Sequence, residues 1–208
     1  MDGLTIGPGK LGGKGIYAAR EFAAGETVLD FELEHLSRAQ FRELAQDEQL
    51  FVHSYGGQRW LYPPPARWVN HSDQPSCYPD FERSCDVALR RITAGEPITI
   101  DATRETDREL STFLEALVNA QGGRDHDGIG RLVSEHAVLW ERGRAAKGAD
   151  DVAAALAAAP PLSLHQAEWH VATGRWEALW SAGNGSDHTT LLLRVLEGNW
   201  QLVYGHRG

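Results

Sequence analysis

Residues 67–77 read Arg67-Trp68-Val69-Asn70-His71-Ser72-Asp73-Gln74-Pro75-Ser76-Cys77, a stretch that changes character halfway along. It opens with an aromatic and a β-branched residue, which predicts a short buried strand. The residues that follow are rich in Asn, Ser, Asp and Pro, which compete with helix and sheet through local hydrogen bonds or a fixed φ. Polar groups at the end of a buried strand often form binding sites. By itself the stretch is more simply a surface turn, so the neighbouring sequence must decide its role.

The composition is typical of a globular protein with one large domain or two of ordinary size. The chain has 208 residues, of which 42% are hydrophobic and 24% charged. No apolar run approaches the roughly 18 residues that a membrane helix needs. The first five residues have neither the basic start nor the apolar segment of a signal peptide. We therefore expect a cytoplasmic protein without a membrane partner.

The net charge of −9 is spread over both halves of the chain, and no basic stripe is present. This distribution argues against a nucleic-acid partner, whereas an acidic surface would attract a basic substrate. The two cysteines, Cys77 and Cys85, are too few for a disulfide framework and form no CxxC pair. The nine histidines leave a His/carboxylate metal site open, but no ligand spacing such as HExxH supports one, so no metal is predicted.

Residues 1–103 are predicted to form a mostly-β domain. Two short runs flank the glycine turn at 24–26, as in a β-hairpin or meander. Ser37 is positioned to cap a short helix that contains Phe41 and Leu44. Short apolar runs separated by Gly and Pro predict strands at 16–19, 27–31, 50–52, 59–62, 87–92 and 97–100.

Residues 104–208 have a different pattern, predicted to form an α+β domain. Apolar residues at 110, 113, 114, 117 and 118 have helical spacing, and Gly122-Gly123 ends that helix. A second short helix follows, then a strand at 137–140 and an alanine-rich helix that begins at Asp150-Asp151. Alternating residues from 167 onward predict antiparallel strands, the last two joined by a hairpin turn at 197–199.

Three segments of the first domain occur in a characteristic order. They are Gly13-Lys14-Gly15-Ile16-Tyr17-Ala18, Arg67-Trp68-Val69-Asn70-His71-Ser72 and Ala94-Gly95-Glu96-Pro97-Ile98-Thr99-Ile100-Asp101. The first alone is weak evidence, because glycines are common in turns. The ordered set, over about residues 5–102, resembles the SET domain of S-adenosylmethionine-dependent protein lysine methyltransferases.

This resemblance implies a fold with knot-like threading, S-adenosylmethionine as cofactor and a lysine-containing basic protein or peptide as substrate. It assigns cofactor binding to Gly13, Lys14, Gly15, Ile16 and Tyr17 of the first segment, together with Asn70 and His71. Gly13 and Gly15 would let the backbone approach the cofactor without an intervening Cβ. Methyl transfer is an in-line displacement in which positioning supplies most of the rate.

The family's catalytic tyrosine position is occupied here by Ala102, and the Cys-rich segment that often follows this domain is missing. Tyr17 and Tyr62 are the candidates for the missing hydroxyl, and Tyr55 and Tyr78 are further alternatives. Two functions therefore stay open for the first domain: a lysine methyltransferase, or a pseudoenzyme or binding module that keeps the fold without the chemistry.

The second domain is similar to the cone-shaped fold of nuclear transport factor 2, SnoaL-like cyclases and ketosteroid isomerase. The resemblance implies an apolar pocket and a homodimer formed through the sheet. The domain would then serve either dimerisation or substrate selection. A third alternative is thus an isomerase, a cyclase or a small apolar ligand binder. The polar candidates for that pocket are His165, Glu168, His170, Asp187 and His206, with walls from Trp140, Trp169, Trp176, Trp180 and Trp200.

Overall fold

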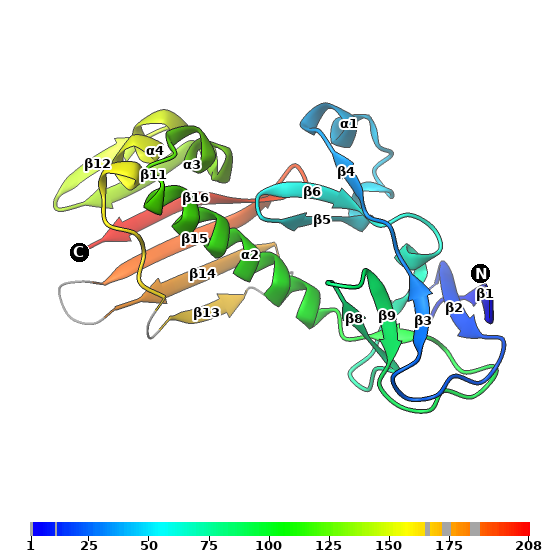
Figure 1. Cartoon of the computed structure of the whole chain (residues 1–208). Coiled ribbons are helices and arrows are strands. Elements are labelled where there is room, and N and C mark those ends of the chain that lie inside the picture. Colours follow the sequence, from blue (N-terminus) through cyan, green and yellow to red (C-terminus); the bar gives the residue numbers. More distant parts are fainter. Residues whose placement is uncertain (1, 11, 165–166, 172–175, 184–187) are drawn as a thin grey trace. The chain divides into compact units, whose positions relative to one another are not determined.

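The computed structural model describes residues 2–10, 12–164, 167–171, 176–183 and 188–208 (Figure 1). Contacts divide the chain into two compact units. The first comprises residues 1–35, 45–52 and 60–107, and the second comprises residues 36–44, 53–59 and 108–208. Two segments from the N-terminal half, 36–44 and 53–59, thus group with the C-terminal residues, whereas the sequence suggested one boundary after residue 103.

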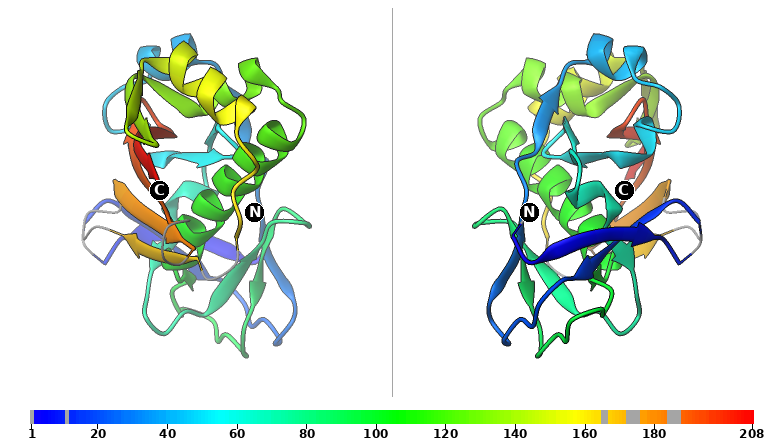
Figure 2. Two further views of the ribbon diagram at one scale, coloured as in Figure 1. Left: turned by 90° about the vertical axis from the view of Figure 1, so that its left-hand side faces the viewer. Right: turned by 90° about the vertical axis from the view of Figure 1, so that its right-hand side faces the viewer.

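The first unit is built mainly from short strands. β1 and β2 form an antiparallel pair (Figure 2, dark blue), a second sheet has the order β3-β9-β8, and β7 pairs in parallel with β10. The elements are β1 (Leu4–Pro8), β2 (Lys14–Ala18), β3 (Thr27–Asp30), η1 (Gln49–Phe51), η2 (Ala66–Trp68), β7 (Asn70–His71), β8 (Cys77–Asp80), β9 (Cys85–Ala88) and β10 (Thr99–Ile100).

The core of the first unit is a single apolar cluster contributed by these strands and the loops between them. Its most buried members, each at most 1% exposed, are Ile16, Phe22, Cys77, Ala88, Ile92 and Ile98. Both cysteines are buried free thiols, and burial raises the pKa of Cys77 to about 12. Such thiols behave as small apolar side chains.

The predicted strands at 16–19 and 27–31 exist, but they do not pair with each other. β2 pairs with β1, and β3 pairs with β9. The reason is that the chain between them bonds to a distant segment, since Phe22 exchanges backbone hydrogen bonds with Ile92 and Ala18 bonds with Gly95 and Glu96.

The short strand predicted at Trp68-Val69 is wrong. Residues 66–68 form the 3-10 helix η2, with Pro65 at its N-cap in the helical region of φ and ψ. Proline pre-sets φ near the value that a turn needs, and three prolines precede this turn. The strand predicted at 50–52 is likewise replaced, up to Phe51, by the 3-10 helix η1.

Four elements lie partly or wholly in the segments 36–44 and 53–59. The helix α1 (Arg38–Glu43) begins with the predicted cap at Ser37, which forms a reciprocal capping box with Gln40. The strands β4 (Glu34–Leu36), β5 (Val52–Tyr55) and β6 (Gln58–Leu61) form a three-stranded sheet with the order β4-β6-β5. Each of these strands has residues in both units.

The second unit contains a six-stranded mixed sheet with the order β12-β11-β16-β15-β14-β13, in which only the β11–β16 pair is parallel among the described strands. Its elements are α2 (Thr103–Gly122, from Arg108 in this unit), α3 (His126–Leu132), β11 (Val133–Glu141), β12 (Arg144–Lys147), α4 (Ala149–Ala158), β13 (Glu168–Val171), β14 (Glu177–Ala182), β15 (Thr189–Leu196) and β16 (Asn199–Arg207).

The predicted apolar stripe of α2 is confirmed, because Leu110, Phe113 and Leu117 are at most 2% exposed and pack in one cluster with Trp180 and Trp200 of the sheet. α2 lies across one face of this sheet, and α4 lies along β11 and β12 (Figure 1). The predicted hairpin between β15 and β16 is also confirmed. Within the described part of the chain, no helix has the length and apolar character that crossing a membrane requires.

Candidate functional site

A cavity of about 390 Å³ in the first unit is lined by residues from all three predicted segments. This volume lies within the range of small-molecule sites. The lining residues are Lys10, Gly15, Ile16, Tyr17, Asn70, His71, Ser72, Gln74, Arg90, Glu96, Pro97, Ile98 and Thr99. The fold thus brings together residues as far apart in the sequence as Gly15 and Thr99.

The first wall is the β1–β2 hairpin, in which two glycines have different roles. Gly13 has a φ of 70°, a conformation that favours glycine over other residues. At Gly15 an added Cβ would lie 3.2 Å from the Asn70 Nδ2 and 3.2 Å from the Pro8 carbonyl oxygen. Gly15 therefore lets Asn70 and the Pro8 carbonyl approach closely, and Gly13 allows the positive φ at this point of the hairpin.

The third segment is hydrogen-bonded to both of the others. The Ala18 N–H donates to the Glu96 carbonyl at 2.9 Å, and the Ile98 N–H donates to the Ile16 carbonyl at 2.9 Å. Further along, the Ser72 N–H donates to the Ile100 carbonyl at 2.9 Å. These backbone hydrogen bonds join residues on both sides of the cavity, so they restrict the movement of its wall.

The Asn70 side chain connects the second segment to the first. Its Nδ2 donates to the Lys14 carbonyl at 3.2 Å and to the Trp68 carbonyl at 3.0 Å. Both amide hydrogens are thereby used. No donor among the described residues reaches its Oδ1, so this oxygen can accept a hydrogen bond from a molecule in the cavity.

His71 is held by the backbone that follows the third segment. The Ala102 N–H donates to the His71 Nδ1 at 3.1 Å, and the His71 Nε2 lies 3.1 Å from the Asp73 Oδ1. Because Nδ1 accepts a hydrogen bond, the neutral ring carries its proton on Nε2 and donates it to Asp73. His71 therefore acts as a link between β7 and the start of α2.

One ion pair and one further cation line the cavity. Arg90 and Glu96 lie 2.5 Å apart, and the hydrogen bond from Arg90 holds the pKa of Glu96 below its usual value. Lys10 adds a positive charge. Lys10, Gln74 and Arg90 line the cavity but are not among the predicted site residues. The only signal for these three residues in the sequence is that each lies within a few residues of one of the three segments.

The two tyrosines proposed from the sequence occupy different environments. The Tyr17 ring lines the cavity, but its hydroxyl donates to the Pro8 carbonyl at 2.6 Å. Tyr62 is 7% exposed, does not line the cavity, and packs its ring against Phe31 at a centroid distance of 5.4 Å. The Ala102 side chain provides only a methyl group at the expected hydroxyl position.

The remaining predicted cofactor residues, Gly13 and Lys14, belong to the hairpin without lining the cavity. The Lys14 ammonium lies over the Trp68 ring at 4.2 Å from its centroid, a cation–π contact. Lys14 therefore stabilises the packing between the hairpin and η2, and its carbonyl positions Asn70.

A family comparison matches residues 13–101 to the model described as the SET domain. The N-terminal region is SET-like. The match covers the three segments and every cavity residue except Lys10. The C-terminal residues lie outside it, so the resemblance to nuclear transport factor 2 stays a prediction. The knot-like threading also stays a prediction.

The chain is similar to solved structures that include the following two. A candidate histone methyltransferase from Plasmodium falciparum is 18% identical, with a TM-score of 0.39 over 49% of this chain and 93% of that one. An inhibitor-bound, humanized mutant of Polycomb Repressive Complex 2 from Chaetomium thermophilum is 20% identical, with a TM-score of 0.39 over 49% of this chain and 15% of that one. No curated protein gave a significant match.

The described residues of the predicted C-terminal site lie in different environments. Trp180 and Trp200 are fully buried in the core, and Trp169 packs against it. Trp140, Trp176, Glu168, His170 and His206 are exposed. His165 and Asp187 lie outside the described residues.

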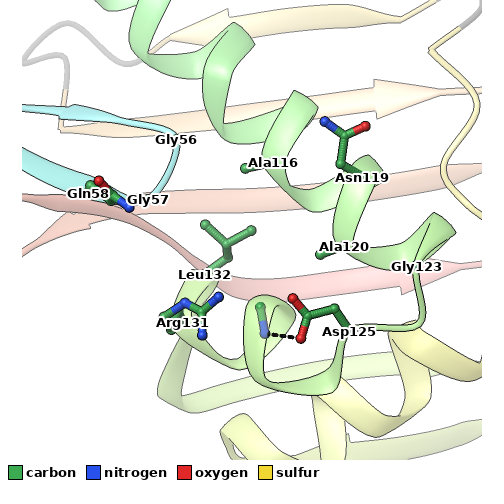
Figure 3. Close-up of a pocket in the computed structure, with 11 residues that line it drawn as sticks. Gly56, Gly57, Gln58, Ala116, Asn119, Ala120, Gly123, Asp125, Arg131 and Leu132 are labelled. Carbon is green, nitrogen blue, oxygen red and sulfur yellow. Dashed lines mark hydrogen bonds between the residues drawn. The ribbon is translucent and has the colours of Figure 1, made fainter.

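A cavity of about 450 Å³ in the second unit is lined by residues other than the predicted C-terminal site residues. Figure 3 shows glycines and polar side chains around it, including Asn119, Asp125 and Arg131. Asp125 is committed to capping α3, since it accepts a hydrogen bond from the Gly128 N–H at 2.9 Å. None of the predicted tryptophans lines this cavity.

Proposed function

We propose that the SET-like region binds S-adenosylmethionine in the 390 Å³ cavity and belongs to the lysine methyltransferase class, with a lysine-containing basic protein or peptide as substrate. The observation that carries this proposal is the single cavity lined by the three segments, which backbone hydrogen bonds hold together. The family match supports the same assignment.

The residues around the cavity suit the chemical groups of this cofactor. S-adenosylmethionine carries an ammonium group, a carboxylate and a sulfonium centre. Glu96 suits the positive groups, Arg90 and Lys10 suit the carboxylate, and Asn70 Oδ1 can accept a hydrogen bond. The absence of a Cβ at Gly15 leaves the hairpin backbone accessible at the cavity.

The cofactor supplies an electrophilic methyl group when bound, and the work of the protein is to position it. The hydrogen bonds that hold Asn70 and His71 fix the second segment before any ligand arrives. Such preorganisation reduces the entropy that must be lost on reaching the reactive geometry. The substrate lysine must reach the site as a neutral amine, so transfer should become faster as the pH rises toward the pKa of lysine.

Calorimetric titration of the full chain with S-adenosylmethionine tests the binding step. We expect saturable binding that Asn70→Ala weakens at least about tenfold, because it removes two hydrogen bonds and one acceptor. Asn119→Ala, an exposed change on α2, is the matched control and should bind like the wild type. An absence of binding heat, or equal affinities in the two variants, would refute the assignment.

A second candidate is a cofactor-binding protein without turnover. It is favoured by Ala102 in place of a hydroxyl and by the engagement of the Tyr17 hydroxyl with Pro8. Transfer of a labelled methyl group to lysine-rich peptides separates the two functions. Methylation by the wild type would exclude the second candidate, whereas methylation only after Ala102→Tyr would establish it.

A further inference from the structure

A second charged cavity, of about 630 Å³, lies wholly within the second unit. We propose that it binds the phosphate group of a small phosphorylated molecule. Four arginines from three different segments line it: Arg38 and Arg42 on α1, Arg59 on β6 and Arg131 on α3. This inference rests on residues other than those that line the 390 Å³ cavity, so it stands whether or not that cavity binds S-adenosylmethionine.

The charge of this cavity is opposite to that of the chain. Its carboxylates are Glu135 and Glu197, so the four arginines leave a net charge of +2 at the cavity in a protein with a net charge of −9. A phosphate monoester carries about −1.5 to −2 at neutral pH, which matches this surplus more closely than a single carboxylate does.

Arg59 is the strongest indication of a ligand. It is only 9% exposed, its Nε donates to the Glu197 carbonyl, and its guanidinium lies 5.9 Å from the Phe41 ring centroid. No acceptor among the described residues reaches its terminal nitrogens, which are the donors that bind phosphate in a fork geometry. These nitrogens are therefore available to an anion that enters the cavity.

The electrostatics of Arg59 agree with its geometry. Burial is the main reason that the pKa of Arg59 is lowered, and the neighbouring Arg38 and Arg42 lower it further against the opposing effect of Glu197. The cavity thus holds several cations that repel one another. A bound dianion would relieve this repulsion.

Glu197 partly neutralises the cavity as an internal counter-ion. It pairs with Arg38, and the Arg42 Nη2 donates to its Oε1 at 2.6 Å. Although partial burial opposes ionisation, the hydrogen bonds from Arg42 and Arg38 hold the pKa of Glu197 below its usual value. Glu197 therefore competes with an incoming anion for two of the four arginines.

The walls are held rigidly by packing and hydrogen bonds. An added Cβ at Gly198 would lie 2.5 Å from the Phe41 ring, so α1 and the β15–β16 turn are in close contact. The Asn199 Nδ2 donates to the Gly57 carbonyl at 2.7 Å. Ser134, 5% exposed, accepts a hydrogen bond from the His136 N–H and can still donate its hydroxyl hydrogen into the cavity.

Calorimetric titration of the full chain with inorganic phosphate, glycerol 3-phosphate and acetate tests this inference. Both phosphates should bind more tightly than acetate. Tighter binding of glycerol 3-phosphate than of inorganic phosphate would identify an organic phosphate as the ligand, and equal affinities would identify free phosphate.

Variants locate the site. Arg131→Gln and Arg59→Lys should each weaken phosphate binding at least about tenfold. Arg131→Gln removes a positive charge, and Arg59→Lys removes the planar pair of N–H donors that a guanidinium presents to a phosphate. Arg194→Gln, which removes an exposed arginine elsewhere on the sheet, is the matched control and should have no effect.

Glu197→Gln should strengthen phosphate binding several-fold, because Arg38 and Arg42 lose their internal counter-ion. Misfolding cannot mimic a gain in affinity. Weaker binding in Glu197→Gln, equal binding in Arg131→Gln and Arg194→Gln, or a preference for acetate would each overturn the inference.

Discussion

Gly15 lines the 390 Å³ cavity beside Asn70. Its missing Cβ is the space into which the Asn70 amide fits, at a distance that would be 3.2 Å to an added carbon. Gly15→Ala should therefore push Asn70 away from the Lys14 carbonyl and weaken cofactor binding at least about tenfold, at a stability cost of about 1 kcal/mol.

Calorimetry and thermal unfolding of the same samples check both effects of this change. Gly122→Ala is the control, because no atom lies within 4 Å of its added Cβ and its backbone is helical. If Gly15→Ala binds the cofactor as the wild type does, close approach at this position is not needed.

Asp86 is a buried carboxyl group whose ionisation should make stability depend on pH. Burial, with a smaller contribution from the Glu105 carboxylate, raises the pKa of Asp86 from 3.8 to about 8. Between these values the folded chain keeps a proton that the unfolded chain has released. The free energy of unfolding should therefore fall as the pH rises through this window, by up to about 1.4 kcal/mol per pH unit.

Urea unfolding at pH values of about 5 and about 8, near the two ends of this window, measures the effect. Asp86→Asn should flatten the dependence, because the amide does not ionise. Asp47→Asn, at an exposed position, keeps Asp86 and should retain the slope of the wild type. If Asp86→Asn keeps the slope of the wild type, Asp86 is not the group that causes the pH dependence.

At the scale of elements, local sequence signals were reliable where the interaction is local. The Ser37 cap, the apolar stripe of α2 and the β15–β16 hairpin each depend on residues within a few positions of one another. The predictions failed where distant residues compete. β2 and β3 do not pair, since residues 92–96 bond to the chain between them.

The segment around Asn70 illustrates the same distinction. Its polar half was predicted to be a turn, yet Asn70 and His71 form the short strand β7, paired in parallel with Thr99 and Ile100 of β10. The hydrogen-bonding groups that stabilise this strand come from residues 29 positions away. The β-propensity of a residue does not take such distant partners into account.

At the scale of the whole molecule, we propose that the outer face of the six-stranded sheet forms a homodimer. Leu179, Leu192 and Tyr204 are direct neighbours across β14, β15 and β16, on the face opposite the buried Trp180. Leu179 is 37% exposed and Tyr204 is 39% exposed. A continuous apolar row on a sheet face is typical of a contact surface.

Leu179→Glu should dissociate such a dimer, because it would bury a charge on each side of the two-fold contact. Sedimentation equilibrium of the full chain gives the mass before and after the change. Ala154→Glu, at an exposed position on α4, is the control and should leave the mass unchanged. A wild-type protein that is monomeric at high concentration would refute this surface.

The mostly-β character of the N-terminal half, the three SET-like segments and the helical stripe of α2 could be predicted from the sequence, because each depends on residue type and short-range spacing. Packing between distant segments, by contrast, brings Asn70, within residues 67–77, against Gly15 and makes Arg90 and Glu96 face the same cavity. It also placed Arg38, Arg42, Arg59, Arg131 and Glu197 around one cavity. These groupings depend on packing between segments far apart in the chain, which spacing in a single sequence does not encode.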